Sequence, residues 1–100
     1  MAIGRRDLVA KARAFTISIG KLSKDERRLN PSGKYGADYN HLRDRVAQLY
    51  PHLESILPPA VRIERSTTGD FTDENYAEVD TFCEQIVQIL TEQGDSQAEE

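Results

Sequence analysis

Residues 39–57, YNHLRDRVAQLYPHLESIL, carry the clearest structural pattern in the chain. Their large apolar side chains recur at steps of three and four residues, at Tyr39, Leu42, Val46, Leu49, Leu53 and Ile56. This spacing places one apolar stripe along one face of an α-helix. Pro51 interrupts the stripe, because proline lacks an amide hydrogen and clashes with the preceding turn. The pattern predicts a central helix over residues 38–57 that is kinked at Pro51 or stops at Tyr50. We favour a short second helix over residues 51–57 that continues the packed face, with Pro51 in its first turn.

Two further segments repeat the helical spacing. Residues 4–19 and 73–93 each carry apolar side chains at steps of three and four, and Thr72 is expected to cap the second of these helices. A short helix is predicted near residues 24–29, where Ser23 and Glu26 match a capping box. Three amphipathic helices that need to bury one face each predict an all-α fold, a small helical bundle.

The expected ends of these helices define the domain. Gly20 and Gly94 are expected to close the first and last helices, since glycine tolerates the left-handed conformation found at many helix ends. We predict one helical domain over residues 1–94 and a disordered acidic tail over residues 95–100.

Two linking segments are harder to interpret. Residues 30–40 are rich in turn-forming residues, and Asp38 is expected to cap the central helix after this loop. Val61 and Ile63 alternate with charged residues in the manner of a strand. Because a single strand has no ladder partner in this chain, we expect an extended connection here unless a second copy pairs with it. Residues 66–70 are predicted to form a loop.

Composition and charge narrow the functional classes. The 100 residues carry a net charge of −4, which divides into +6 over residues 1–50 and −10 over residues 51–100. The two halves could pair within one chain or between chains, or could serve two different partners. No apolar run approaches the roughly 20 residues that cross a bilayer. The N-terminal residues have charges scattered through them and lack the pattern of a signal peptide, so we expect a cytoplasmic protein and no membrane partner.

Few residues suggest chemistry. Asp38, His41 and Asp44 could form a metal or acid–base cluster on one helical face, although a solvated polar face explains them as well. Cys83, the one cysteine, lies on the apolar side of the last helix and is expected to be a small buried hydrophobe. No nucleophile motif, zinc pattern or dinucleotide fingerprint is present. We therefore expect neither an enzyme nor a bound cofactor or metal.

We favour a protein–protein interaction module, a small accessory, adaptor or regulatory protein that binds another protein or a second copy of itself. The candidate partner surface comprises Arg27, Arg28, Lys34, Tyr35 and Tyr39, although the tyrosines could instead pin the 30–40 loop to the bundle. The candidate dimer seam on the last helix comprises Phe82, Ile86 and Ile89.

Nucleic-acid binding by the basic half is the alternative function. Cations that could contact phosphate groups are frequent there, at Arg5, Arg6, Lys11, Arg13, Lys21, Lys24, Arg27, Arg28 and Lys34. The acidic second half and the sequence pI near 5.2 argue against it.

Overall fold

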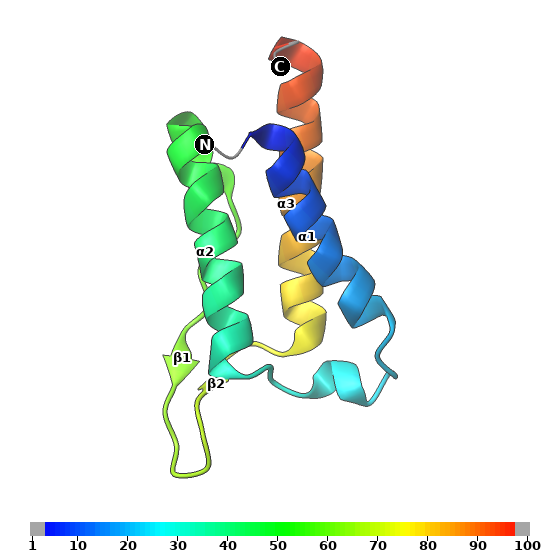
Figure 1. Ribbon diagram of the computed structural model, residues 1–100, viewed down its shortest axis with the longest axis vertical. Coiled ribbons are helices and arrows are strands. Elements are labelled where there is room, and N and C mark those ends of the chain that lie inside the picture. The colour runs from blue at the N-terminus through cyan, green and yellow to red at the C-terminus, as the bar shows by residue number, and fades with distance from the viewer. Residues whose placement is uncertain (1–3, 98–100) are drawn as a thin grey trace.

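The computed structural model describes residues 4–97, with side chains described as far as Glu92. Three α-helices form a bundle, α1 (Arg5–Gly20), α2 (Gly33–Leu49) and α3 (Tyr76–Gln97) (Figure 1). Two short 3-10 helices, η1 (Glu26–Arg28) and η2 (Pro51–Ile56), and two short strands, β1 (Ile63–Glu64) and β2 (Phe71–Thr72), lie between them. The all-α bundle predicted from the sequence is confirmed.

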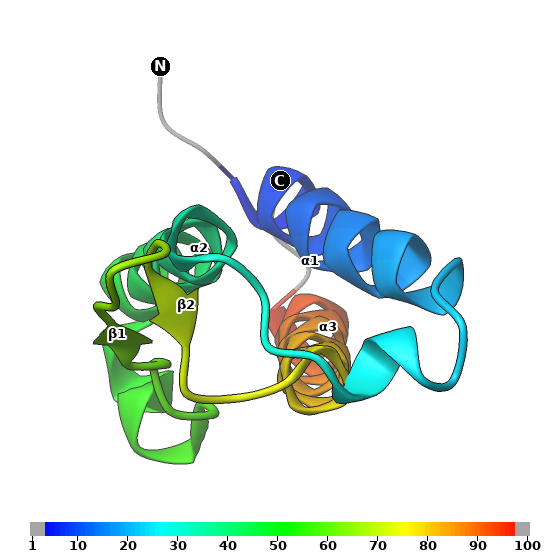
Figure 2. The same ribbon diagram turned by 90° about the horizontal axis from the view of Figure 1, so that it is seen from below.

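The helices do not simply alternate in direction. In Figure 1 α1 runs down the page and both α2 and α3 run up, so α1 is antiparallel to its neighbours and α2 is parallel to α3. Two parallel helices need a connection that travels back along the bundle. Residues 50–75, which we call the return segment, form this connection and include η2 and both strands. Viewed along the bundle, α1 lies beside α3, and α2 stands with the strands on the other side (Figure 2).

The core follows the predicted stripes for the most part. The buried apolar side chains come from all three helices and from the return segment: Leu8, Ala12, Ile19, Tyr39, Leu42, Val46, Tyr50, Leu53, Leu57, Val61, Val79, Cys83, Ile86 and Leu90. No helix within residues 4–97 is both long enough and apolar enough to span a membrane.

The central helix begins earlier than the sequence suggested. Ser32, not Asp38, is its cap, and the Ser32 hydroxyl accepts a hydrogen bond from the Tyr35 amide at 3.3 Å. The expected 30–40 loop is therefore helical from Gly33 onward. Gly33 and Gly36 permit this because both lie directly against the return segment: a Cβ at Gly36 would overlap the Thr72 Cγ2 methyl, and one at Gly33 would come within 2.7 Å of Asp70 Cβ.

Pro51 ends α2, and the short second helix expected after it is confirmed as η2. The helix stops at Leu49, and η2 begins with Pro51 in its first turn, where a missing amide hydrogen removes no bond. The tighter 3-10 winding changes which side chains face inward. The expected continuation of the packed face past Pro51 is confirmed at Leu53, which is buried, and is wrong at Ile56, which is 59% exposed. Leu49, the last residue of α2, is also 42% exposed.

The predicted helix over residues 24–29 is a single turn, η1. Its capping box is confirmed, since the Ser23 amide donates to Glu26 Oε1 at 2.8 Å and the Glu26 amide donates to Ser23 Oγ at 3.1 Å. Arg27 reaches back to the end of α1, where its guanidinium donates to the carbonyl oxygens of Ile19 and Gly20. Gly20 itself does not adopt the left-handed conformation expected of it.

The strand-like residues find a partner within the chain, contrary to expectation. Ile63 pairs with Thr72 and Glu64 with Phe71 in an antiparallel hairpin. The predicted loop between them contains Gly69, whose φ of 134° only glycine adopts readily. The Pro31 carbonyl oxygen accepts from the Thr72 amide at 2.9 Å, which fixes the hairpin to the start of α2.

The last helix starts later and runs further than predicted. Asn75 caps it, accepting from the Glu78 amide at 2.9 Å. Thr72 is instead buried in β2, and its hydroxyl donates to the Glu74 carbonyl oxygen. α3 continues past Gly94 to Gln97, and residues 98–100 of the predicted tail lie outside the described residues.

Candidate functional site

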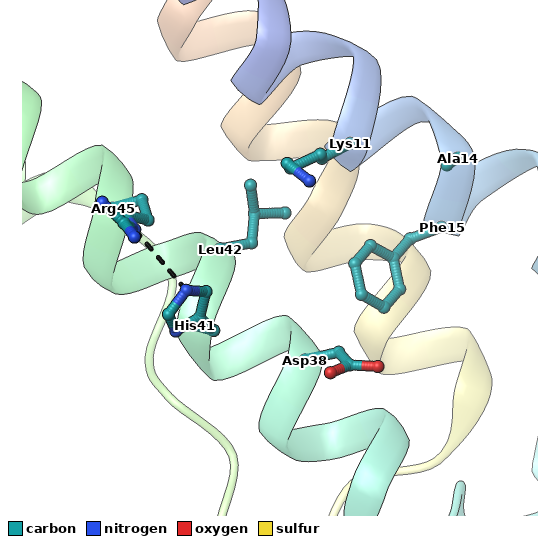
Figure 3. Close-up of a pocket in the computed structure, with 7 residues that line it drawn as sticks. All are labelled: Lys11, Ala14, Phe15, Asp38, His41, Leu42 and Arg45. Atoms are coloured by element: carbon teal, nitrogen blue, oxygen red, sulfur yellow. Dashed lines mark hydrogen bonds between the residues drawn. The ribbon is translucent and has the colours of Figure 1, made fainter. Parts of the chain in front are cut away.

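An open groove separates α1 from α2. Its main hollow has a volume of about 340 Å³ and is lined by Lys11, Ala14, Phe15, Asp38, His41, Leu42 and Arg45 (Figure 3). A second hollow of about 180 Å³ continues along the same helices and is lined by Ala14, Phe15, Ser18 and Tyr35. Ala14 and Phe15 belong to both hollows, so they form one continuous depression, which we call the α1–α2 groove.

The groove combines an apolar floor with charged walls. Phe15 and Leu42 supply aromatic and aliphatic surface, and Lys11 projects from α1 above them (Figure 3). On α2, Arg45 donates a long hydrogen bond of 3.5 Å from Nε to His41 Nε2. Within the described part of the chain, neither Lys11 nor Arg45 forms an ion pair. Both cations are therefore available to a carboxylate brought by a ligand.

Tyr35 closes one end of the groove. Its ring packs edge-on against Phe15 at 5.1 Å and against Tyr76 at 5.3 Å between ring centres. Its hydroxyl lies 3.3 Å from Ser18 Oγ. Burial raises the pKa of Tyr35, and the hydrogen bond to Ser18 opposes this rise. Ser18 Oγ also lies 3.4 Å from the Phe15 carbonyl oxygen, and neither of its partners is a general base that could activate it.

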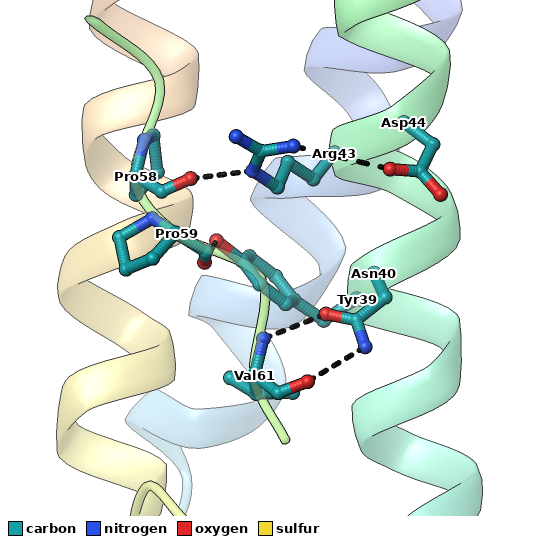
Figure 4. A network of polar contacts seen from close by, with 7 residues as sticks. All are labelled: Tyr39, Asn40, Arg43, Asp44, Pro58, Pro59 and Val61. Atoms are coloured by element: carbon teal, nitrogen blue, oxygen red, sulfur yellow. Dashed lines mark hydrogen bonds and ion pairs between the residues drawn. The ribbon is translucent and has the colours of Figure 1, made fainter. Parts of the chain in front are cut away.

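The other side of α2 is closed by the return segment (Figure 4). Asn40 binds both backbone groups of Val61, accepting from its amide at 2.8 Å and donating to its carbonyl oxygen at 2.9 Å. Tyr39 Oη donates to the Pro59 carbonyl oxygen at 2.9 Å, and Arg43 Nε donates to that of Pro58 at 2.6 Å. These contacts leave the α1 side as the open flank of α2.

The candidate partner surface does not form one exposed cluster. Tyr39 is fully buried, and burial followed by the nearby Cys83 raises its pKa. Arg27 is half-buried and holds the end of α1, and Tyr35 is half-buried in the groove. Arg28 and Lys34 alone among the five are exposed. The tyrosines therefore pack this segment against the bundle.

The acidic and histidine residues of α2 separate into two groups. Asp38 and His41 line the α1–α2 groove, and Asp44 lies outside its lining, with Oδ1 3.9 Å from Arg43 Nη1. Over the described residues, no group of three or more His, Cys, Asp or Glu side chains could hold a metal ion.

The candidate dimer seam faces its own chain. Ile86 is fully buried, Phe82 packs beside Tyr39 with 5.9 Å between ring centres, and Ile89 is half-buried against the core. Cys83 on the same helix is a free, buried thiol. Burial, and then the charges of Asp80 and Glu84, raise its pKa to about 12, which disfavours the reactive thiolate at neutral pH.

A second depressed surface runs along α1 and α3, on a different side of α1 from the groove. One hollow of about 360 Å³ is lined by Arg13, Thr16, Ile17, Glu84, Val87 and Gln88. A neighbouring hollow of about 590 Å³ is lined by Arg5, Arg6, Val9, Ala10, Arg13, Ile17 and Thr91. Arg13 and Ile17 line both hollows, and we call the combined surface the α1–α3 face.

Sequence reasoning identified Asp38, His41 and Tyr35 but missed Lys11, Phe15 and Arg45 as members of one site. Lys11 and Phe15 lie on α1 and Arg45 lies on α2, so their proximity depends on how the helices pack. The one signal in the sequence is the small side chain of Ala14, which leaves space on the α1 wall of the groove.

No protein-family model, curated protein or solved structure matches this chain.

Proposed function

We propose that this chain is a non-catalytic protein-binding module, a small cytoplasmic accessory, adaptor or regulatory protein. The α1–α2 groove receives a segment of a partner protein that carries apolar side chains and a carboxylate. The observation that supports this proposal is the pairing of an apolar floor, Phe15 and Leu42, with the cations Lys11 and Arg45, which have no carboxylate partner among the described residues.

Physical chemistry favours such a ligand. An apolar side chain that leaves water for the groove floor gains about 1.5–3 kcal/mol when it is fully buried. A carboxylate near Lys11 and Arg45 adds charge-assisted hydrogen bonds and directs the orientation of the segment. Asp38 in the same lining disfavours a continuous polyanion. The groove therefore suits a peptide with a local negative charge better than a nucleic acid.

The nucleic-acid alternative has weaker support. Of the basic residues in the first half, Arg27 donates its hydrogen bonds to the end of α1. Binding to a labelled oligonucleotide, measured by fluorescence anisotropy, would have to weaken steeply with salt for this alternative to hold.

The test is selection from a displayed library of random peptides. We expect wild-type protein to enrich peptides that combine apolar residues with Asp or Glu. The double variant Lys11→Glu/Arg45→Glu should lose these peptides, because it replaces the groove cations by like charges. The matched control Lys34→Glu reverses an exposed cation of α2 outside the groove and should retain them.

Two results would contradict the proposal. Enrichment of basic peptides, or of none, would show that the groove does not prefer carboxylates. Equal loss of binding in Lys34→Glu and in the groove variant would move the site to the exposed cations Arg28 and Lys34. A partner protein captured from lysate would support the proposal if it stays bound after nuclease treatment and is lost in the Lys11→Glu/Arg45→Glu variant.

A further inference from the structure

The α1–α3 face presents apolar surface that nothing in the described part of the chain covers. Ile17 lies where its two hollows meet and is 61% exposed. Val9 and Val87 are half-buried beside it, and Ala10 adds a small side chain. An exposed β-branched residue in a depression gains from contact with another surface, because burial removes its apolar area from water.

The charges on this face are segregated between its two walls. On the α1 wall, Arg6 and Arg13 are exposed and positive. On the α3 wall, Glu84 is exposed and negative. Arg13 and Glu84 line the same hollow, and no ion pair joins them within residues 4–92. Each wall is therefore complementary to the other and repels a copy of itself.

We infer that the α1–α3 face binds a second copy of this chain. A two-fold axis parallel to the helices, lying in the contact plane, places α1 of one copy over α3 of the other. Residues keep their level along such an axis, so Arg13 of each copy meets Glu84 of the other. The Ile17 side chains are buried near the axis. The contact is isologous, as most homodimer contacts are.

The alternative symmetry is disfavoured by the same charges. A two-fold axis perpendicular to the helices would place α1 on α1 and bring Arg13 opposite other arginines.

Analytical ultracentrifugation of the full chain over a range of concentrations tests the dimer. We expect wild type to dimerise reversibly. Arg13→Glu or Glu84→Arg should raise the dimer Kd about tenfold or more, because each change makes both symmetry-related pairs repulsive. Ile17→Ser should also weaken the dimer without unfolding the monomer, since Ile17 is mostly exposed.

Mixing the two single charge variants gives the decisive result. In a mixed dimer, the side chain that Arg13→Glu introduces in one copy faces the side chain that Glu84→Arg introduces in the other, and the two carry opposite charges. The native pair of Arg13 and Glu84 forms once as well, so the mixture should dimerise when neither variant does alone. The double variant Arg13→Glu/Glu84→Arg should likewise recover the wild-type Kd. Circular dichroism checks that each variant is folded.

Several outcomes would overturn the inference. A wild-type chain that stays monomeric at high concentration would do so, as would a mixture no more dimeric than its components. Lys11→Glu is the matched control, because it makes the same charge change on α1 within the α1–α2 groove. It should lose peptide binding and keep the dimer, so the two proposals are tested separately.

Discussion

Gly36 lies where the structure leaves no space for a side chain. A Cβ there would overlap the Thr72 Cγ2 methyl and approach Val61 Cγ2 to 3.2 Å. Thr72 cannot readily turn away, because its hydroxyl donates to Glu74 O at 2.6 Å and its amide donates to Pro31 O at 2.9 Å. Gly36→Ala therefore tests how firmly α2 is seated on the hairpin.

Two opposing effects set the magnitude. Alanine is better than glycine in a helix interior by about 1 kcal/mol. Extra carbon in a packed interior costs about 1–3 kcal/mol, and the overlap with Thr72 places this site at the upper end. We expect Gly36→Ala to lower the free energy of unfolding by about 2 kcal/mol.

Thr72→Ser supplies the partner for a double-mutant cycle. It removes the Cγ2 methyl and keeps the hydroxyl, at a cost of about 1 kcal/mol for the lost methyl. In that background Gly36→Ala should be nearly neutral or stabilising, which gives a coupling energy of about 2 kcal/mol. Urea unfolding of the four proteins, followed by circular dichroism, measures it.

Gly20→Ala serves as the control, because a Cβ there meets nothing within 4 Å. It should leave stability unchanged or raise it. Additive effects of Gly36→Ala and Thr72→Ser would refute the reasoning, since two side chains in direct overlap cannot act independently.

Three further predictions concern the same bundle. Asn40→Ala should lower the free energy of unfolding by about 1–3 kcal/mol, because it leaves both backbone groups of Val61 without their partner. Thermal unfolding measures it, and a loss below about 0.5 kcal/mol, the size of a neutral surface change, would be evidence against the contact. Ser32→Ala should lower the free energy of unfolding, measured in urea, by about 1 kcal/mol, because it removes the cap of α2. Asp38→Ala should lower it much less, and the reverse order would identify Asp38 as the cap. The raised pKa of Cys83 means that the thiol ionises first in the unfolded chain, so stability is full below its ordinary pKa of 9.0 and falls as pH rises towards about 12. Urea unfolding across this range should show a shallower decline in Cys83→Ala, and identical slopes would contradict the shift.

The helical periodicity predicted the bundle because it depends on local physics. The buried residues of α3, Val79, Cys83, Ile86 and Leu90, follow the predicted stripe, since an uninterrupted helix keeps its phase. Beyond Pro51 the stripe held at Leu53 but not at Ile56, which faces outward, and Leu49 at the end of α2 is also exposed. The start of α2 at Ser32 was also missed, because Gly33 and Gly36 suggested a turn. Their role in close packing against the return segment is seen only in the folded chain.

The site was less predictable than the fold for a related reason. Asp38 and His41 stood out by residue type, but Lys11 and Phe15 join them only through the packing of α1 beside α2. The hairpin partner of Ile63 was missed because Phe71 and Thr72 looked like the start of a helix. A single sequence reports which face of a helix is apolar. It does not report which helix that face will meet.

The parallel course of α2 and α3 bears on how the chain assembles. Contacts between α2 and the return segment join residues that are nearer in sequence than those of α1 and α3, which meet across most of the chain. If α2 and the return segment assemble first, the loop that α1 must close on α3 becomes effectively shorter, and its entropic cost falls.

We therefore expect Asn40→Ala to slow folding in stopped-flow kinetics and Val79→Ala, which changes a buried residue of α3, mainly to speed unfolding. The opposite pattern would place the nucleus between α1 and α3. On this account the long connection between two parallel helices is where folding begins, and the first and last helices are the last parts to come together.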